Sequence, residues 1–153
     1  MEGHVKKAEE LFLSGCNCAQ AVFAAFTDVT GMDEDTALML ASSFGGGCGR
    51  LREVCGACSG LFMIAGLLRG YGKSPQDGEK KAHYELIQRL AAQFREENGS
   101  IICRELLKNI AADTLPVPSP RTEEYYNARP CIRFVSCAAR LAERELTGGG
   151  RDC

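Results

Sequence analysis

The stretch "SGLFMIAGLLRGYG" at residues 59–72 decides the fold class, because Arg69 is its only charged residue. A helix with apolar side chains all round is buried, so we predict that this segment is the central helix of the protein. Gly60 and Gly66 lack side chains, so neighbouring elements can approach closely there. No segment alternates between apolar and polar residues as a half-buried strand would. We therefore predict an all-α, single-domain helical bundle of about five to seven helices.

Further helices are predicted on both sides of this segment. The segment 74–99 carries apolar residues at helical spacing, and its Gly99 supplies a stop signal. Asp33 is a predicted N-terminal cap, and Pro130 is expected in the first turn of the last helix. Residues 114–130 hold four of the five prolines, so we predict an irregular crossing there.

Length and charge limit the class of protein. The chain has 153 residues, of which 45 % are hydrophobic, and we assign one domain to residues 1–147 and a flexible tail to 148–153. A net charge of −2 with no basic stripe argues against nucleic-acid binding. The longest uncharged runs, residues 11–27 and 54–68, are shorter than the roughly 18–20 apolar residues of a membrane span. We expect a soluble, cytoplasmic protein with no membrane partner.

The nine cysteines are the main chemical signal. In a reducing compartment so many thiols indicate metal binding or redox chemistry. Cys55 and Cys58 form a C-x-x-C motif at a predicted helix start, where the helix dipole favours thiolate, so they could form a disulfide or share a metal. Cysteines begin three other predicted helices, whereas some of the rest fit as core residues or as an unpaired thiol in the tail. The helix starts carry Cys18, Cys103 and Cys131; the core candidates are Cys48 and Cys137; the tail holds Cys153.

The glycine run Gly45, Gly46 and Gly47 precedes the central helix and suggests that a cofactor or helix lies close to the backbone. Its amides could instead hold an anion, but the Lys-Ser/Thr of a phosphate-binding loop is missing. Arg50 and Arg52 could stabilise thiolates or attract an anionic partner; equally, they could be exposed loop residues.

Four segments together resemble a known family of redox-active proteins, named C_GCAxxG_C_C for its cysteine pattern. The segments are "NCAQAV" at 17–22, "GGGCGRLREVCGACSG" at 45–60, "CRELL" at 103–107 and "CIRFVSCAA" at 131–139. The resemblance runs over roughly residues 5–146 and matches the family cysteines to Cys18, Cys55, Cys103 and Cys131. A similar region occurs at the C-terminal end of split-Soret cytochromes, where it is associated with an iron–sulfur centre. The resemblance therefore implies a helical module that gathers four cysteines for a cluster or a redox dithiol.

Several functions remain open at this point. In the first, Cys18, Cys55, Cys103 and Cys131 ligate an iron–sulfur cluster for electron transfer to an unidentified redox partner protein. In the second, the protein is a thiol–disulfide oxidoreductase in which Cys55 attacks and Cys58 resolves. A structural zinc site and a protein with inert buried thiols are further alternatives, and the helical surface is compatible with a homodimer. His4, near a terminus expected to fray, and His83 are not predicted as ligands.

Overall fold

The structure of the protein is a computed structural model that describes residues 2–110 and 113–148. Over these residues the predicted all-α fold is confirmed, since they contain no strand and only one isolated antiparallel bridge, between Val54 and Ile102. The elements are α1 (Glu2–Leu13), α2 (Cys18–Ala24), α3 (Thr27–Thr30), α4 (Glu34–Ala41), the 3₁₀ turn η1 (Ser42–Phe44), α5 (Gly45–Cys48), α6 (Gly56–Arg69), α7 (Glu79–Asn98), α8 (Cys103–Leu106), α9 (Glu123–Ala128) and α10 (Cys131–Leu146).

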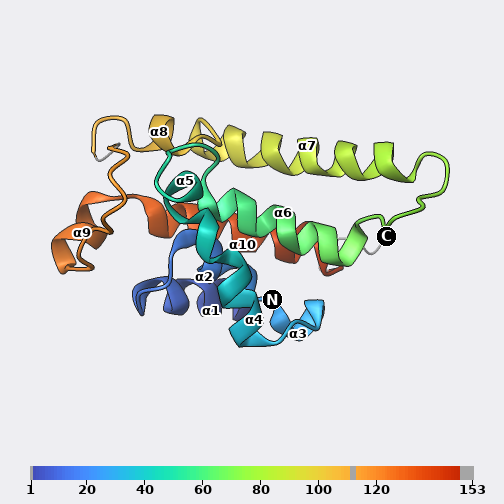
Figure 1. The fold of residues 1–153 in the computed structure, drawn as a ribbon, viewed down its shortest axis with the longest axis horizontal. Coiled ribbons are helices and arrows are strands. Elements are labelled where there is room, and N and C mark those ends of the chain that lie inside the picture. The colour runs from blue at the N-terminus through green and yellow to red at the C-terminus, as the bar shows by residue number, and fades with distance from the viewer. Residues whose placement is uncertain (1, 111–112, 149–153) are drawn as a thin grey trace.

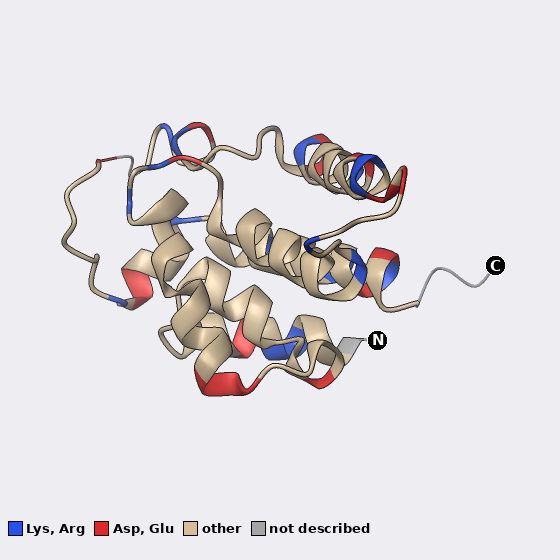
Figure 2. Ribbon diagram, turned by 45° about the vertical axis from the view of Figure 1, so that its right-hand side comes forward, with Lys and Arg blue, Asp and Glu red and all other residues tan. Residues whose placement is uncertain are grey.

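Helix α6 lies at the centre of the molecule, as its apolar sequence predicts. It packs against α2, α10 and α7, and Figure 1 shows α7 on one side of it and α1, α2 and α4 on the other. Gly60 allows the close approach of α2, because a Cβ atom there would lie 2.9 Å from the Cβ of Val22. The same expectation is wrong for Gly66, which is exposed and has no atom within 4 Å of a Cβ built there. Figure 2 shows α6 almost free of charge up to its last turn, whereas α7 carries both signs along its length.

Two predicted helix ends are found where the sequence signals place them. The Asp33 side chain accepts a hydrogen bond from the Thr36 amide at 3.0 Å and caps α4. Gly99 ends α7 in the left-handed conformation with φ +96°, which glycine adopts without a Cβ penalty. Local chemistry therefore determines these boundaries.

The structure differs from the sequence prediction in the number and placement of its short helices. It contains more helical segments than the predicted five to seven, because α3, α5 and α8 are only four residues long. The predicted irregular crossing contains α9, which begins beyond Pro120 where Thr122 accepts a hydrogen bond from the Tyr125 amide at 3.2 Å. Pro130 is the N-cap of α10 and not part of its first turn.

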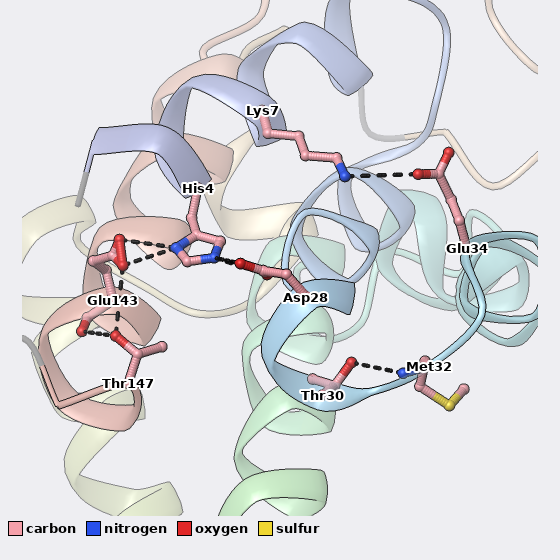
Figure 3. Close-up of polar contacts among 8 residues, drawn as sticks. All are labelled: His4, Lys7, Asp28, Thr30, Met32, Glu34, Glu143 and Thr147. Atoms are coloured by element: carbon pink, nitrogen blue, oxygen red, sulfur yellow. Dashed lines mark hydrogen bonds and ion pairs between the residues drawn. The ribbon is translucent and has the colours of Figure 1, made fainter.

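The expectation that the N-terminus frays is wrong for α1. His4 lies between two carboxylates, with Nδ1 2.8 Å from Glu143 of α10 and Nε2 2.9 Å from Asp28 of α3 (Figure 3). Its ring also stacks on Phe26 at a centroid distance of 4.3 Å. We call His4, Asp28 and Glu143 the His4 site; it joins three helices that are distant in the sequence.

Two sequence-based expectations concern the ends of the chain and its solubility. Most of the predicted tail, including Cys153, lies outside the described residues. None of the helices within 2–110 and 113–148 is long and apolar enough to cross a membrane.

Candidate functional site

One cavity of about 280 Å³ brings together four cysteines from four different segments: Cys18, Cys55, Cys103 and Cys131 line it. Each stands at a helix start, as predicted: Cys55 is the N-cap of α6, and the others are the first residues of α2, α8 and α10. We call this space the cysteine cavity. Its volume far exceeds the ~10–15 Å³ that one water molecule needs.

Backbone pairing between two distant loops brings Cys55 and Cys103 together. The Cys55 amide donates to the Ile101 carbonyl at 2.8 Å, and the Cys103 amide donates to the Glu53 carbonyl at 2.6 Å. These bonds flank the Val54–Ile102 bridge. Because both backbones are fixed by the same short ladder, the two thiols face one cavity although 47 residues separate them.

Cys18 and Cys131 meet across the cavity through the first turns of α2 and α10. Asn17 and Gln20 form a reciprocal capping box that fixes the start of α2, with both hydrogen bonds at 2.9 Å. The Cys18 and Cys131 thiols are close enough for each to shift the pKa of the other. Cys131 is buried, and Cys18 is partly exposed.

The predicted cofactor-binding glycines, Gly45, Gly46 and Gly47, form part of the wall of the cavity. A Cβ atom at Gly47 would lie 2.7 Å from both the Cβ of Cys103 and the amide nitrogen of Glu53. One at Gly45 would lie 2.4 Å from the side chain of Asn17. The glycines are therefore required for the close packing of this loop against the segments that carry Cys103 and Cys18.

This loop follows a left-handed path. The backbone has positive φ at six of the seven residues 46–52, namely Gly46, Gly47, Cys48, Gly49, Arg50 and Arg52. For the three that are not glycine this conformation is strained by roughly 1–2 kcal/mol each. The loop thereby turns the Arg50 and Arg52 side chains to the same cavity as the thiols.

Four arginines line the cavity, and no aspartate or glutamate is found among its described lining residues. Arg52 is only 2 % exposed and donates through Nη1 to the Cys103 sulfur at 3.6 Å. Arg129 stacks on Tyr125 at 4.5 Å, and Arg121 stacks on the same ring at 4.8 Å. Arg50 completes the set. Sequence analysis proposed Arg50 and Arg52 but missed Arg121 and Arg129, which lie in a proline-rich segment without a recognisable motif.

The surroundings shift the pKa values of Cys18, Cys103 and Cys131 in different directions. The hydrogen bond from Cys18 lowers the pKa of Cys131 against the effect of burial, and the nearby Arg129, Arg121 and Arg52 cations lower it further. That same hydrogen bond, together with burial, raises the pKa of Cys18 well above its ordinary value. Burial raises the pKa of Cys103, and the hydrogen bond from Arg52 partly offsets this. Cys131 therefore carries thiolate at a lower pH than an ordinary cysteine does.

Cys58 occupies a different environment from Cys55. It is fully buried and does not line the cavity, and its hydrogen bond to Cys55 and its burial raise its pKa. No disulfide links the cysteines of the described segments. Cys137 is also buried away from the cavity and accepts a hydrogen bond from Asn98 at 3.4 Å. The sequence-predicted roles of Cys55 as nucleophile and Cys58 as resolving thiol stay predictions.

The metal prediction also stays a prediction. Within the described parts of the chain, no three Cys, His, Asp or Glu side chains are arranged closely enough to hold a single metal ion. The four thiols are instead distributed around a cavity of about 280 Å³.

The fold and the site together define the class of this protein: it is a helical protein in which four cysteines line one arginine-lined cavity. Comparison with protein families matches residues 16–145 to the family described as "Putative redox-active protein (C_GCAxxG_C_C)". The chain belongs to this family, as the sequence resemblance indicated. No significant match was found among curated proteins or among solved structures.

Proposed function

We propose that Cys18, Cys55, Cys103 and Cys131 hold an iron–sulfur cluster and that the protein transfers electrons through it. The observation that carries this proposal is that these four cysteines, from four segments, line one cavity. Four thiolates are the ligand set that [2Fe–2S] and [4Fe–4S] clusters require. The redox character of the family agrees with this function.

The residues of the cavity suit such a group chemically. Thiolates bound to iron–sulfur clusters carry net negative charge, and the cavity offers four arginines without an opposing carboxylate among its described lining residues. A volume of about 280 Å³ accommodates a group of several atoms and is large for a single zinc ion. When bound, a cluster would supply one-electron chemistry.

The protein's own groups would then hold and protect the centre. The glycine wall admits the backbone close to the thiols, and Phe134 and Leu107 line the cavity with apolar surface. Arg52 holds the Cys103 sulfur from the buried side. The thiols must stay reduced before they bind metal, so the proposal places the protein in a reducing compartment such as the cytoplasm.

A dithiol reaction between Cys18 and Cys131 is the second candidate, because both thiols line the cavity and each shifts the pKa of the other. The Cys131 thiolate would attack a substrate disulfide and release one substrate thiolate. Cys18 would then attack the Cys131 sulfur of the mixed disulfide. A Cys18–Cys131 disulfide forms and the second substrate thiolate leaves, so that the substrate disulfide has gained two electrons in total. This pair differs from the Cys55–Cys58 pair that the sequence suggested, since Cys58 does not face the cavity.

Anaerobic purification followed by a visible spectrum, with iron, sulfide and zinc assayed on the same sample, tests the proposal. We expect brown protein with stoichiometric iron and sulfide that bleaches on reduction. Colourless protein with stoichiometric zinc would contradict it in favour of a structural site. Colourless, metal-free protein in which mild oxidation links Cys18 to Cys131 would favour the second candidate.

Serine variants identify the ligands. Replacement of any of the four cavity cysteines by serine should reduce bound iron severalfold or abolish it. Cys137→Ser is the matched control, because Cys137 is buried like Cys131 and lies on the same helix but outside the cavity. Equal iron content in all five variants would exclude a shared site.

A further inference from the structure

The positive charge of the cysteine cavity is not balanced by acidic side chains. Of its four arginines only Arg50 forms an ion pair with a described carboxylate, Asp113, at 3.2 Å. Arg121 donates instead to the carbonyl groups of Phe12 and Cys16, and Arg129 donates to the hydroxyl of Ser119. The cavity is therefore a region of positive potential.

Arg52 carries the strongest indication of a ligand. Its Nε donates to the Asp113 carbonyl at 2.8 Å and its Nη1 faces the Cys103 sulfur, but its Nη2 is buried without a partner among the described residues. A buried donor without an acceptor is unfavourable, because it has lost its hydration without replacement. The side chain is only 2 % exposed and lines the cavity, so water at the outer surface does not replace the missing acceptor.

The backbone at Arg52 supports the same interpretation. Its φ of +63° is strained for a side-chain-bearing residue, and hydrogen bonds on both sides hold it: its amide donates to the Gly46 carbonyl, and its carbonyl accepts from the Arg104 amide. The chain thus fixes one guanidinium rigidly at the cavity wall. A fixed guanidinium nitrogen without a partner can donate charge-assisted hydrogen bonds to a carboxylate or oxyanion.

We propose that the cavity binds a small anion with a carboxylate or oxyanion group at Nη2 of Arg52, and that such anions bind next to the proposed redox centre. Arg121 and Arg129, which also line the cavity, contribute electrostatic attraction. The volume of about 280 Å³ lies just below the roughly 300–1,000 Å³ of pockets that bind drug-sized ligands, so an anion that shares the cavity with the proposed centre must be small. The second half of this proposal rests on the proposed redox function, whereas the binding half does not.

Calorimetric titration of the full chain with sodium sulfate and with sodium acetate, at constant ionic strength in chloride, tests the binding. We expect saturable binding of at least one of these anions, weakened at least tenfold in Arg52→Gln and less in Arg52→Lys. Arg69→Gln is the matched control, because Arg69 lies at the other end of α6 and donates to the Glu145 carbonyl. No saturable binding, or equal affinity in wild type and Arg52→Gln, would overturn the proposal.

The same titration on purified and on chelator-treated protein separates this proposal from the proposed function. Iron and sulfide contents report on the cluster, and the affinity reports on the anion. Binding in both samples supports the whole proposal. Binding only after chelation would overturn its second half, because Nη2 would then serve the centre and not an anion next to it.

A second measurement uses the wild-type protein, so its result does not depend on whether a variant folds. Chelator-treated wild-type protein is alkylated with anionic iodoacetate and, separately, with neutral iodoacetamide. For each cysteine, the rate with iodoacetate is divided by the rate with iodoacetamide. We expect this ratio to be severalfold higher at Cys103 and Cys131 than at Cys16, which is partly exposed and does not line the cavity. A ratio at the cavity cysteines no higher than that at Cys16 would overturn anion attraction.

Discussion

The cysteine cavity and the His4 site treat charge in opposite ways. At the His4 site, a basic ring lies within 2.9 Å of a carboxylate on each side, and the two acids come from different helices. In the cysteine cavity, Arg52 is buried, one of its nitrogens has no partner among the described residues, and no carboxylate lines the described wall. Side chains that pair with a carboxylate of the same chain, as His4 does, join helices to each other. A charged side chain with an unpaired donor, as Arg52 has, is available to a ligand. The following substitutions test this difference.

The largest expected effect is that of Gly47→Ala, which breaks the wall of the cavity. The new Cβ would lie 2.7 Å from the amide nitrogen of Glu53 at a residue with φ +74°. We expect a loss of about 3 kcal/mol or more in the free energy of unfolding, measured in urea. The control is Gly31→Ala, at φ +76° with no atom within 4 Å, which should lose about 1–2 kcal/mol. Equal losses of stability would show that the atoms packed against Gly47 do not contribute to the effect.

His4→Ala breaks the other side of the comparison. It leaves the Glu143 carboxylate, which is only 7 % exposed, without its imidazole partner. We expect destabilisation of about 1–3 kcal/mol without loss of bound metal or anion. Urea unfolding together with iron analysis measures both. A change below ~0.5 kcal/mol, or a loss of the bound group, would contradict the purely structural role of this site.

The pH dependence of Cys131 alkylation sharpens the electrostatic description of the cavity. Because its pKa is lowered, the reactive thiolate persists to lower pH, and alkylation in metal-free protein should begin at lower pH than at Cys137, whose pKa burial raises. Cys18→Ala should move the Cys131 profile upward more than Arg129→Gln does, because the Cys18 hydrogen bond is the larger cause. Mass spectrometry of the alkylated peptides against pH gives both profiles. Coinciding profiles for Cys131 and Cys137 would contradict this description.

The smallest effect is expected at an exposed ion pair beside the His4 site. Lys7 and Glu34 are 3.6 Å apart, and their side chains are 43 % and 52 % exposed (Figure 3). Lys7→Ala should change the free energy of unfolding by about 0.5 kcal/mol or less, because water screens such pairs. Thermal unfolding compared with that of His4→Ala measures the contrast. A loss as large as that of His4→Ala would remove the distinction between buried and exposed pairing.

Features set by neighbouring residues could be predicted from the sequence. The Asp33 cap, the Gly99 stop and the burial of Leu61, Ile64 and Ala65 follow from residue type and spacing. The all-round burial predicted for this helix is wrong near its end, where Leu67 is 49 % exposed. The gathering of the four cysteines was implied by the family resemblance and agrees with their positions at helix starts.

The rest depends on long-range contacts that leave no local signal. The pairing of residues 53–55 with 101–103 has no alternating strand pattern, and the positive φ of Arg50 and Arg52 occurs at residues that rarely adopt it. The burial of Arg52 follows from that backbone path, so a loop arginine in the sequence becomes a cavity residue. For the same reason, His4 could not be paired with Glu143, which lies 139 positions away.

The left-handed path of residues 46–52 has a stereochemical consequence. A D-amino acid has the mirror-image preference of an L-residue, so the positive φ values of Cys48, Arg50 and Arg52 would be relaxed geometry for D-residues. Over this one turn the backbone has the conformation that a chain of D-residues would prefer. The handedness of the turn therefore opposes that of the neighbouring helices α2, α6 and α8, and the hydrogen bond from the Arg104 amide to the Arg52 carbonyl holds its last residue.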